Sequence, residues 1–361
     1  MSLPLSRFTV VRRSALTLCL ALAAAALCVW LRTPIPWMIG PLLATSVASV
    51  VGVPTFSVHA LRNTGQWVIG TALGLYFTPA VGALVASLWW VIGMGIVWAL
   101  AMGLAFSWCL YRLHRDRLPG VAPAQWLTTA YFSGAIGGAS EMTLIAERWG
   151  ARTDLVAAAH TLRVLLVTVT IPFAMQIWGV HDLDRSLPGV RAVDPAGLGL
   201  LAVLTLAGAL VMRRTGRANP WFMGALLVAM ALTLSGAELS AIPPWLSNAA
   251  QLVIGVSLGV RFTPAFVHTA PRWLASVAVA TVVMMVLCAT FARLLADLTG
   301  LPWATLVLGT SPGGIAEMAI TAKVLQLGVP VVTAFQVCRL VAVLVLAEPV
   351  YRSFRRRLQT A

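Results

Sequence analysis

The sequence predicts an all-α polytopic membrane protein made of two inverted-topology repeats, with about ten transmembrane helices and a glycine-broken hairpin in each half. Three observations support this fold class: the composition, an internal duplication, and the distribution of arginines among the loops. Of the 361 residues, 60% are hydrophobic and only 10% are charged, whereas soluble domains carry about 25% charged residues. Most of the chain must therefore face lipid rather than water.

The two halves share sequence motifs in the same order. Arg163 also matches Arg339, since 339 − 163 = 176 and GGASEM is separated from GGIAEM by the same number of residues. An ordered duplication of this kind predicts repeated membrane modules. The matching segments are PWMIGPLLA at 36–44 and PWFMGALLV at 220–228, GQWVIGTALGLYFTPA at 65–80 and AQLVIGVSLGVRFTPA at 250–265, and GGASEM at 137–142 and GGIAEM at 313–318.

Most of the apolar runs in each half have about the 20 residues that a spanning helix needs. The first run follows Arg12 and Arg13 as a signal peptide would, but a matching run opens the second half, so we expect a retained helix. The runs cover 14–31, 36–53, 64–79, 81–111, 125–149 and 154–178, then 196–212, 219–236, 248–263, 272–298, 303–327 and 329–350. The expected organisation is a cytoplasmic N-terminus at 1–13, a first membrane repeat at 14–180, a connecting loop at 181–195, a second repeat at 196–350 and a basic cytoplasmic C-terminus at 351–361.

The arginines predict how the two halves are oriented. Arg112, Arg115 and Arg117 follow the fourth run of the first half, whereas the matching loop near 297–302 has an aspartate and no base. Basic loops stay in the cytoplasm, and the basic side switches in every pair of corresponding loops. We therefore expect inverted halves in a bacterial inner (cytoplasmic) membrane, each half crossing an odd number of times, with both termini cytoplasmic. One run in each half then does not cross fully, and the fifth is the candidate for a re-entrant hairpin.

The fifth run of each half is interrupted by glycine and proline, in SGAIGGASEM at 133–142 and GTSPGGIAEM at 309–318. Irregular backbone is tolerated at membrane depth only where it is buried in protein or lines a wet cavity. A helix that restarts at Ser140 or Ala316 points its positive N-terminal end at the break and favours an anionic group. Paired breaks in inverted repeats are the best sequence indication of a transporter binding site.

Four charged residues accompany these breaks: Glu141 and Glu317 at the restarts, and Arg163 and Arg339 further along, each inside an apolar helix. A charge at the centre of a membrane helix costs about 2.5–3.5 kcal/mol, so these four require partners. One interpretation is a structural Glu–Arg ion pair in each half; the other is that one or both pairs contact substrate or carry a coupling proton. The expected substrate- or ion-binding residues are Gly137, Gly138, Ser140, Glu141, Arg163, Thr310, Ser311, Pro312, Gly313, Gly314, Glu317 and Arg339.

Other polar and small residues each have two interpretations. Lys323, the only lysine, stands where the first half has Glu147, and it either tunes substrate choice or snorkels to the interface. The hydroxyl residues beside the breaks fit ordinary helix packing better than ligand binding. The glycines of VIGTALG and VIGVSLG indicate close helix crossing, with Gln66 and Gln251 as polar contacts.

Composition and spacing also argue against other classes of protein. A net charge of +14 would suit a nucleic-acid partner, but the arginines gather at the ends of apolar runs as cytoplasmic loops require, so no nucleic acid is expected. The five cysteines and five histidines show no paired or clustered spacing, so we expect no metal, cofactor or disulfide. The expected partners are membrane lipid and an unknown small-molecule solute, with H⁺ or Na⁺ as a coupling ion and a homodimer as an option.

The motifs PWMIGPLLA, GAIGGASEMTLIAE and GTSPGGIAEMAITA resemble the AbrB family of membrane proteins, and the similarity covers nearly the whole chain. The resemblance implies a duplicated module and, more remotely, the inverted-repeat carriers of the cation/proton antiporter and anion transporter superfamily. The second break is the sharper one, because it has Pro312 where the first has Ile136. Members of the family also carry two other labels, regulator of gene expression and ammonia monooxygenase.

The leading hypothesis is therefore a secondary transporter of a small solute, with a leaning towards organic anions and no enzymatic activity. The breaks would hold the solute near mid-membrane, Arg163 and Arg339 would balance its charge, and Glu141 or Glu317 would titrate or bind a cation. A membrane-bound regulator without transport is the first alternative. A membrane oxidase is the second, and it requires a metal-ligand cluster that the sequence does not contain.

Overall fold

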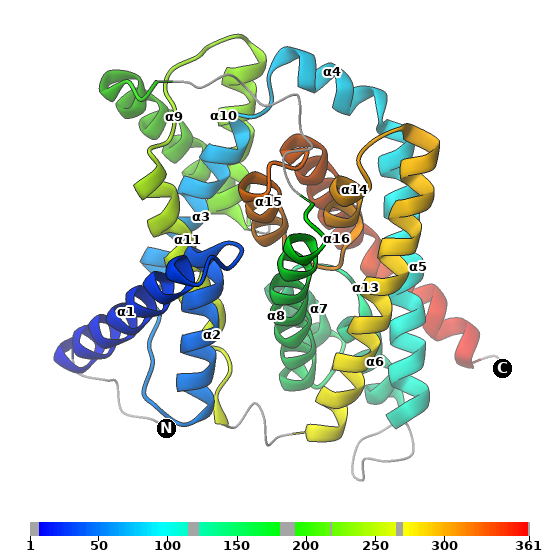
Figure 1. Ribbon diagram of the computed structural model, residues 1–361. Coiled ribbons are helices and arrows are strands. Elements are labelled where there is room, and N and C mark those ends of the chain that lie inside the picture. The colour runs from blue at the N-terminus through cyan, green and yellow to red at the C-terminus, as the bar shows by residue number, and fades with distance from the viewer. Residues whose placement is uncertain (1–6, 115–122, 181–191, 217–218, 265–269, 360–361) are drawn as a thin grey trace. The chain divides into compact units, whose positions relative to one another are not determined.

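The computed structural model describes residues 7–114, 123–180, 192–216, 219–264 and 270–359, and the regular structure in these residues is entirely helical (Figure 1). Two arginines of the orientation argument, Arg115 and Arg117, lie outside the described residues, as do residues 181–191 of the connecting loop. The helices are α1 (Arg7–Trp30), α2 (Pro36–Val50), α3 (His59–Gly74), α4 (Pro79–Ser87), α5 (Trp89–His114), α6 (Pro123–Gly134), α7 (Ala139–Arg148), α8 (Thr153–Ile177), α9 (Pro195–Arg214), α10 (Pro220–Leu234), α11 (Pro244–Gly259), α13 (Pro271–Thr299), α14 (Trp303–Thr310), α15 (Ile315–Val324) and α16 (Val329–Gln359).

Six of the described helices (α1, α5, α8, α9, α13 and α16) are long and apolar enough to cross a membrane. A seventh crossing results if α3 and α4, which are bent by 90° relative to each other, form one broken span. Helices α2 and α10 are apolar but have only 15 residues each. The chain is thus a helical membrane protein, while the expected ten crossings stay a prediction. The apolar run expected at 81–111 is not one helix, because α4 ends at Ser87 and α5 begins at Trp89.

The chain folds into two compact units that do not coincide with the two sequence repeats. Unit 1 comprises Met1–Leu84, Pro172–Thr269 and Lys323–Gln326, and unit 2 comprises Val85–Ile171, Ala270–Ala322 and Leu327–Ala361. Each unit therefore takes segments from both repeats. The repeat boundaries and their inverted orientation remain predictions.

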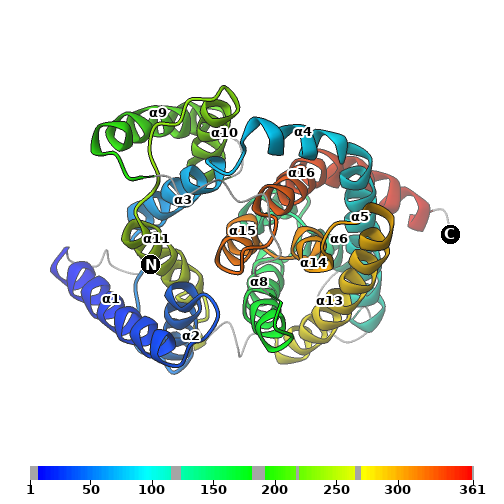
Figure 2. The ribbon, with the colours of Figure 1, turned by 45° about the horizontal axis from the view of Figure 1, so that its top comes forward.

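In unit 1 the second helix of each repeat packs on the third helix of the other repeat, α2 on α11 and α3 on α10 (Figure 2). Gly70 of α3 crosses α10 so closely that a Cβ atom at this position would collide with the carbonyl oxygen of Phe222. Gly255 of α11 meets the carbonyl oxygen of Met38 of α2 in the same way. The predicted close crossing at VIGTALG and VIGVSLG is confirmed. The side chain of Gln66 adds a weak polar contact to the Asn219 side chain, at 3.5 Å.

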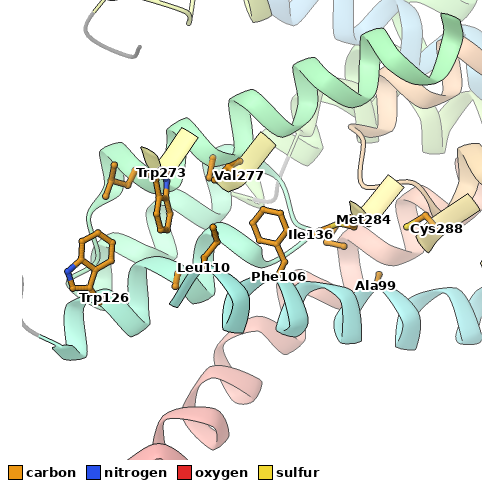
Figure 3. Close-up of a cluster of buried hydrophobic side chains, with 12 residues drawn as sticks. Ala99, Phe106, Leu110, Trp126, Ile136, Trp273, Val277, Met284 and Cys288 are labelled. Atoms are coloured by element: carbon orange, nitrogen blue, oxygen red, sulfur yellow. The ribbon is translucent and has the colours of Figure 1, made fainter. Parts of the chain in front are cut away.

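The hydrophobic core of unit 2 supports the first of the two helix interruptions. Buried side chains of α5, α6, α8 and α13 form one cluster, which includes Phe106, Trp126, Trp273 and Met284 (Figure 3). Ile136, from the segment between α6 and α7, is 3% exposed and belongs to this cluster. Burial of its side chain fixes the non-helical backbone on the core, as required for irregular backbone at membrane depth.

Candidate functional site

Both predicted interruptions are present, and both lie in unit 2. Helix α6 ends at Gly134 and α7 begins at Ala139; α14 ends at Thr310 and α15 begins at Ile315. Each restart lies one residue before the position expected from the sequence. Pro312 falls within the second interruption. The four helix ends at these interruptions carry unpaired backbone groups that other parts of the chain must satisfy.

Arg163 binds the C-terminal end of α6. Its side chain comes from α8 and is 2% exposed. Nη1 donates to the carbonyl oxygens of Ser133 and Gly134 at 3.4 and 3.5 Å, and Nη2 donates to that of Ala135 at 3.2 Å. Helix C-termini carry partial negative charge, so a buried cation is stabilised here without a carboxylate.

His160 connects Arg163 to the same helix end. Arg163 Nη2 lies 2.8 Å from His160 Nδ1, and His160 Nε2 lies 2.8 Å from the carbonyl oxygen of Phe132. Because a guanidinium can only donate, Nδ1 must accept and Nε2 must carry the proton that it donates to Phe132. The imidazole is therefore neutral in this arrangement, and both of its nitrogens are used.

Arg339 and Gln336, both on α16, bind the C-terminal end of α14 in the corresponding way. Arg339 donates through Nη1 to the carbonyl oxygen of Ser311 and through Nη2 to that of Gly313, the latter at 2.8 Å. Gln336 Nε2 donates to the carbonyl oxygen of Leu308 at 2.7 Å and to that of Ser311 at 3.2 Å. The second interruption is thus held by closer contacts than the first.

His160 and Gln336 are site residues that the sequence reasoning missed, although a signal was present. Each stands three residues before its arginine, and 336 − 160 = 176 is the spacing that relates the two arginines. Their acceptors Phe132 and Leu308 are separated by the same number of residues. Positions i and i+3 share one face of a helix, so a polar residue there points to the same helix end as the arginine.

The glutamates lie at the opposite ends of the interruptions, on the N-termini of α7 and α15. A Cβ atom added at Gly138 would collide with Glu141 Oε2 and lie 3.0 Å from its Cδ. A Cβ atom added at Gly314 would collide with Glu317 Oε2 and lie 2.8 Å from its Cδ. Each carboxylate therefore folds back over the residue that precedes its helix, where the partial positive charge of the N-terminus stabilises it.

The buried methionine of each motif requires the first glycine of the pair, because a larger residue there would collide with it. A Cβ atom at Gly137 would lie 3.0 Å from the side chain of Met142, and one at Gly313 would lie 2.8 Å from Met318. Both methionine side chains are fully buried. The shared sequence GG-x-x-E-M thus describes one local structure, in which the first glycine makes room for the methionine and the second for the glutamate.

In the described part of the chain, the two arginines have neither carboxylate partners nor complete hydrogen bonding. Among the described residues, no ion pair of 4.0 Å or less joins Arg163 or Arg339 to a glutamate, so the interpretation as structural Glu–Arg ion pairs does not hold for these residues. Both guanidinium groups are buried within unit 2. The Nε atoms of both arginines are buried and find no hydrogen-bond partner among the residues that the structure describes, and the same holds for Ser133 Oγ and Gln336 Oε1. Buried polar atoms of this kind usually have a partner such as water or a ligand.

The remaining predicted residues take more ordinary positions. The hydroxyls of Thr310 and Ser311 donate to carbonyl oxygens of their own helix, which is the packing interpretation. Ser140 is exposed on the first turn of α7. Within unit 1, Lys323 Nζ donates to Ser247 Oγ of α11 at 3.1 Å. In the part of the chain that the structure describes, no group of three or more His, Cys, Asp or Glu residues is placed to hold a metal ion.

Comparison with known proteins gives consistent matches over most of the chain. The family model described as "Transition state regulatory protein AbrB" matches residues 37–355. "Uncharacterized protein YhjN" of Bacillus subtilis (strain 168) is 26% identical over 343 residues, covering 88% of this chain and 87% of that protein. "Putative regulator AbrB" of Escherichia coli (strain K12) is 25% identical over 326 residues, covering 88% of this chain and 90% of that protein. None of these descriptions names an enzyme.

Proposed function

This chain belongs to the AbrB family, and we propose that it is a secondary transporter of a small solute, with a preference for organic anions. The solute site lies between the two interruptions of unit 2. The chemistry of that site supports this function, whereas the names of the relatives describe only a regulator or an uncharacterized protein.

The observation that carries the proposal is the state of the two buried arginines. Arg163 and Arg339 are 2% and 6% exposed, and both belong to unit 2. Each leaves its Nε–H group without a partner among the described residues. Two like charges in an apolar setting repel each other, and two free N–H donors require acceptors. An anion with carboxylate oxygens near both groups relieves the repulsion and satisfies both donors.

The interruptions lie close together in unit 2, as one shared site requires. A Cβ atom at Gly138, in the first interruption, would lie 3.7 Å from the side chain of Leu340 on α16. Leu340 directly follows Arg339, which holds the second interruption. A short stretch of α16 therefore contacts both breaks, as a site formed at paired breaks in repeats would demand.

The glutamates have a different role in this proposal. Glu141 and Glu317 already occupy the N-terminal ends of α7 and α15, so these ends do not need the solute as their anion. We assign the two carboxylates to the coupling ion, either H⁺ or Na⁺, whose binding would weaken their attraction to the helix ends. The arginines then bind the solute and the glutamates bind the driving ion.

Ligand screening of the detergent-purified full chain tests the proposed substrate class. The panel contains monocarboxylates, dicarboxylates, neutral amino acids and organic cations, and the readout is the shift in thermal unfolding temperature, since a ligand that binds the native state stabilises it. The proposal predicts stabilisation by one or more carboxylates, followed by their uptake into proteoliposomes under a proton or sodium gradient. Stabilisation by organic cations alone would contradict the anion preference.

A membrane-bound regulator without transport is the second candidate, favoured by the names of the family and of the Escherichia coli relative. The two candidates differ in flux. A regulator binds its ligand in the thermal-shift assay but does not move it across a liposome membrane, whereas a carrier does both. A transporter that imports a signal metabolite would affect gene expression indirectly.

A further inference from the structure

Apart from the interruptions, unit 2 contains a large apolar groove between α5 and α13. Its volume is about 420 Å³. The two helices pack against each other (Figure 1), and residues of both line the groove in antiparallel order. Its lining includes Met102, Ala105, Leu113, Ser276, Val279 and Leu287. Several of these side chains are exposed, among them Val279 at 66%, so the groove opens on the surface of the molecule.

The length of the groove matches one leaflet of a bilayer. From Met102 to Leu113 the helix rises about 16 Å at 1.5 Å per residue. The hydrocarbon core of a bilayer is about 30 Å thick, so the groove runs through about half of it. The lining is apolar apart from Ser276, whose hydroxyl is 2.9 Å from His114 Nε2 at one end. A hydrocarbon chain of one leaflet fits both the length and the chemistry.

Two exposed arginines mark the end at which His114 meets Ser276. Arg112 lies on the last turn of α5, and its Cζ atom is 4.8 Å from the ring centroid of Trp108. Arg272 lies on the first turn of α13. Among the described residues, neither forms an ion pair with a carboxylate. The N-terminus of the 29-residue helix α13 adds partial positive charge at the same end. An exposed tryptophan beside arginine is typical of the membrane–water interface.

We propose that the α5–α13 groove is a binding site for one acyl chain of an anionic phospholipid whose phosphate binds Arg112 and Arg272. The positive charge of Arg112 and Arg272 at one end of the groove favours a phospholipid over a second copy of this chain. An isologous contact between two copies would bring these arginines close to their own counterparts, and the like charges would repel each other. The site is independent of the proposed solute site, whose arginines lie on α8 and α16.

Native mass spectrometry of the delipidated, detergent-purified full chain tests this site with two probes, dioleoylphosphatidylglycerol and dioleoylphosphatidylcholine. The wild type should bind one phosphatidylglycerol more tightly than phosphatidylcholine. Arg112→Gln and Arg272→Gln should each weaken phosphatidylglycerol binding about fivefold, the factor that corresponds to about 1 kcal/mol per basic residue near a membrane surface. Arg293→Gln is the matched control, because Arg293 is an exposed arginine of α13 that lies 293 − 272 = 21 residues from Arg272.

A second pair of variants tests occupation of the groove itself. Val279→Phe fills the groove from an exposed position and should abolish the binding of both lipids. Val286→Phe adds the same ring to α13 at a position that is 61% exposed and does not line the groove, so lipid binding should persist. Thermal unfolding of each variant shows whether the fold is intact.

Three results would overturn the proposal. The first is equal affinity of the wild type for the two lipids, and the second is a loss with Arg293→Gln as large as that with Arg272→Gln. The third is a dimer mass that Val279→Phe abolishes, which would identify a second copy of the chain as the occupant. Tight binding of phosphatidylglycerol that requires both arginines and an open groove supports it.

Discussion

Replacing Gly314 with alanine should destabilise the protein mainly through its effect on one side chain, that of Glu317. The added Cβ atom would collide with Glu317 Oε2 and lie 2.8 Å from Cδ. Because the colliding atoms are at the end of a flexible side chain, the carboxylate can move away, but it then leaves the N-terminus of α15. The lost helix-end contact is worth about 1–2 kcal/mol in a partly buried setting.

A double-mutant cycle isolates this contribution. Gly314→Ala in the wild type should lower the free energy of unfolding by about 1–2 kcal/mol. In a Glu317→Ala background the same change should cost only about 0.5 kcal/mol, because the collision is absent and only the preference for glycine over alanine at a helix N-cap is left. The expected coupling between the two sites is therefore about 0.5–1.5 kcal/mol. Unfolding in mixed micelles, followed by titration with a denaturing detergent, provides the four free energies.

The first repeat and an open position provide controls for the cycle. Gly138→Ala with Glu141→Ala should show coupling of the same sign, because a Cβ atom at Gly138 would collide with Glu141 Oε2. Gly93→Ala, in α5, meets no atom within 4 Å and should be neutral or slightly stabilising in a helix. Equal costs of Gly314→Ala in the two backgrounds would refute the idea that the second motif glycine exists to accommodate the glutamate.

Three further predictions concern the arginines, the helix crossings and the buried histidine. Arg339→Ala should cost about 3–5 kcal/mol, because two buried charge-assisted hydrogen bonds are lost. Arg163→Ala should cost a similar amount, because it removes three longer carbonyl contacts of 3.2–3.5 Å and the 2.8 Å bond to His160. Detergent unfolding measures both, and a cost below about 1 kcal/mol for either variant would contradict the geometry. Gly70→Ala and Gly255→Ala should each lower the free energy of unfolding by about 1–3 kcal/mol, because the added methyl group meets backbone carbonyls that cannot move aside. Unchanged unfolding temperatures of both variants would show that the helices cross less closely than described. The free energy of unfolding of His160→Gln should stay within about 1 kcal/mol of the wild type in the same assay, because Gln336 occupies the corresponding position in the second repeat. Loss of the folded protein would show that the imidazole is required.

Local features of the site could be predicted from the sequence because local rules govern them. Closely spaced glycines disfavour a helix through GAIGG, and proline lacks the N–H that would continue the helical ladder through SPGG. The interruptions accordingly appear within one residue of their expected positions. The close crossing at Gly70 and Gly255 followed from small residues in repeated apolar motifs. The repetition itself identified Arg163 and Arg339 as corresponding buried charges.

The partners of these charges could not be predicted in the same way. Opposite charges at matching positions suggested Glu–Arg ion pairs, but each interruption creates two helix ends of opposite polarity, and these compete for the side chains. In the structure the arginines bind the C-terminal ends and the glutamates lie on the N-terminal ends. The division into two units depends on contacts such as α2 with α11 and α3 with α10. These contacts join helices from different repeats, so no local sequence pattern within one repeat indicates them.

Solute uptake by proteoliposomes that contain Arg339→Lys tests the central claim most directly. Lysine keeps the positive charge but loses the planar fork that binds two carbonyl oxygens and a solute oxygen together. With the carboxylate identified by screening, the wild type should show gradient-driven uptake above that of empty liposomes, and the folded variant should show little or none. Equal uptake by the two proteins, or binding by the wild type without any uptake, would contradict a carrier whose solute is held by these arginines.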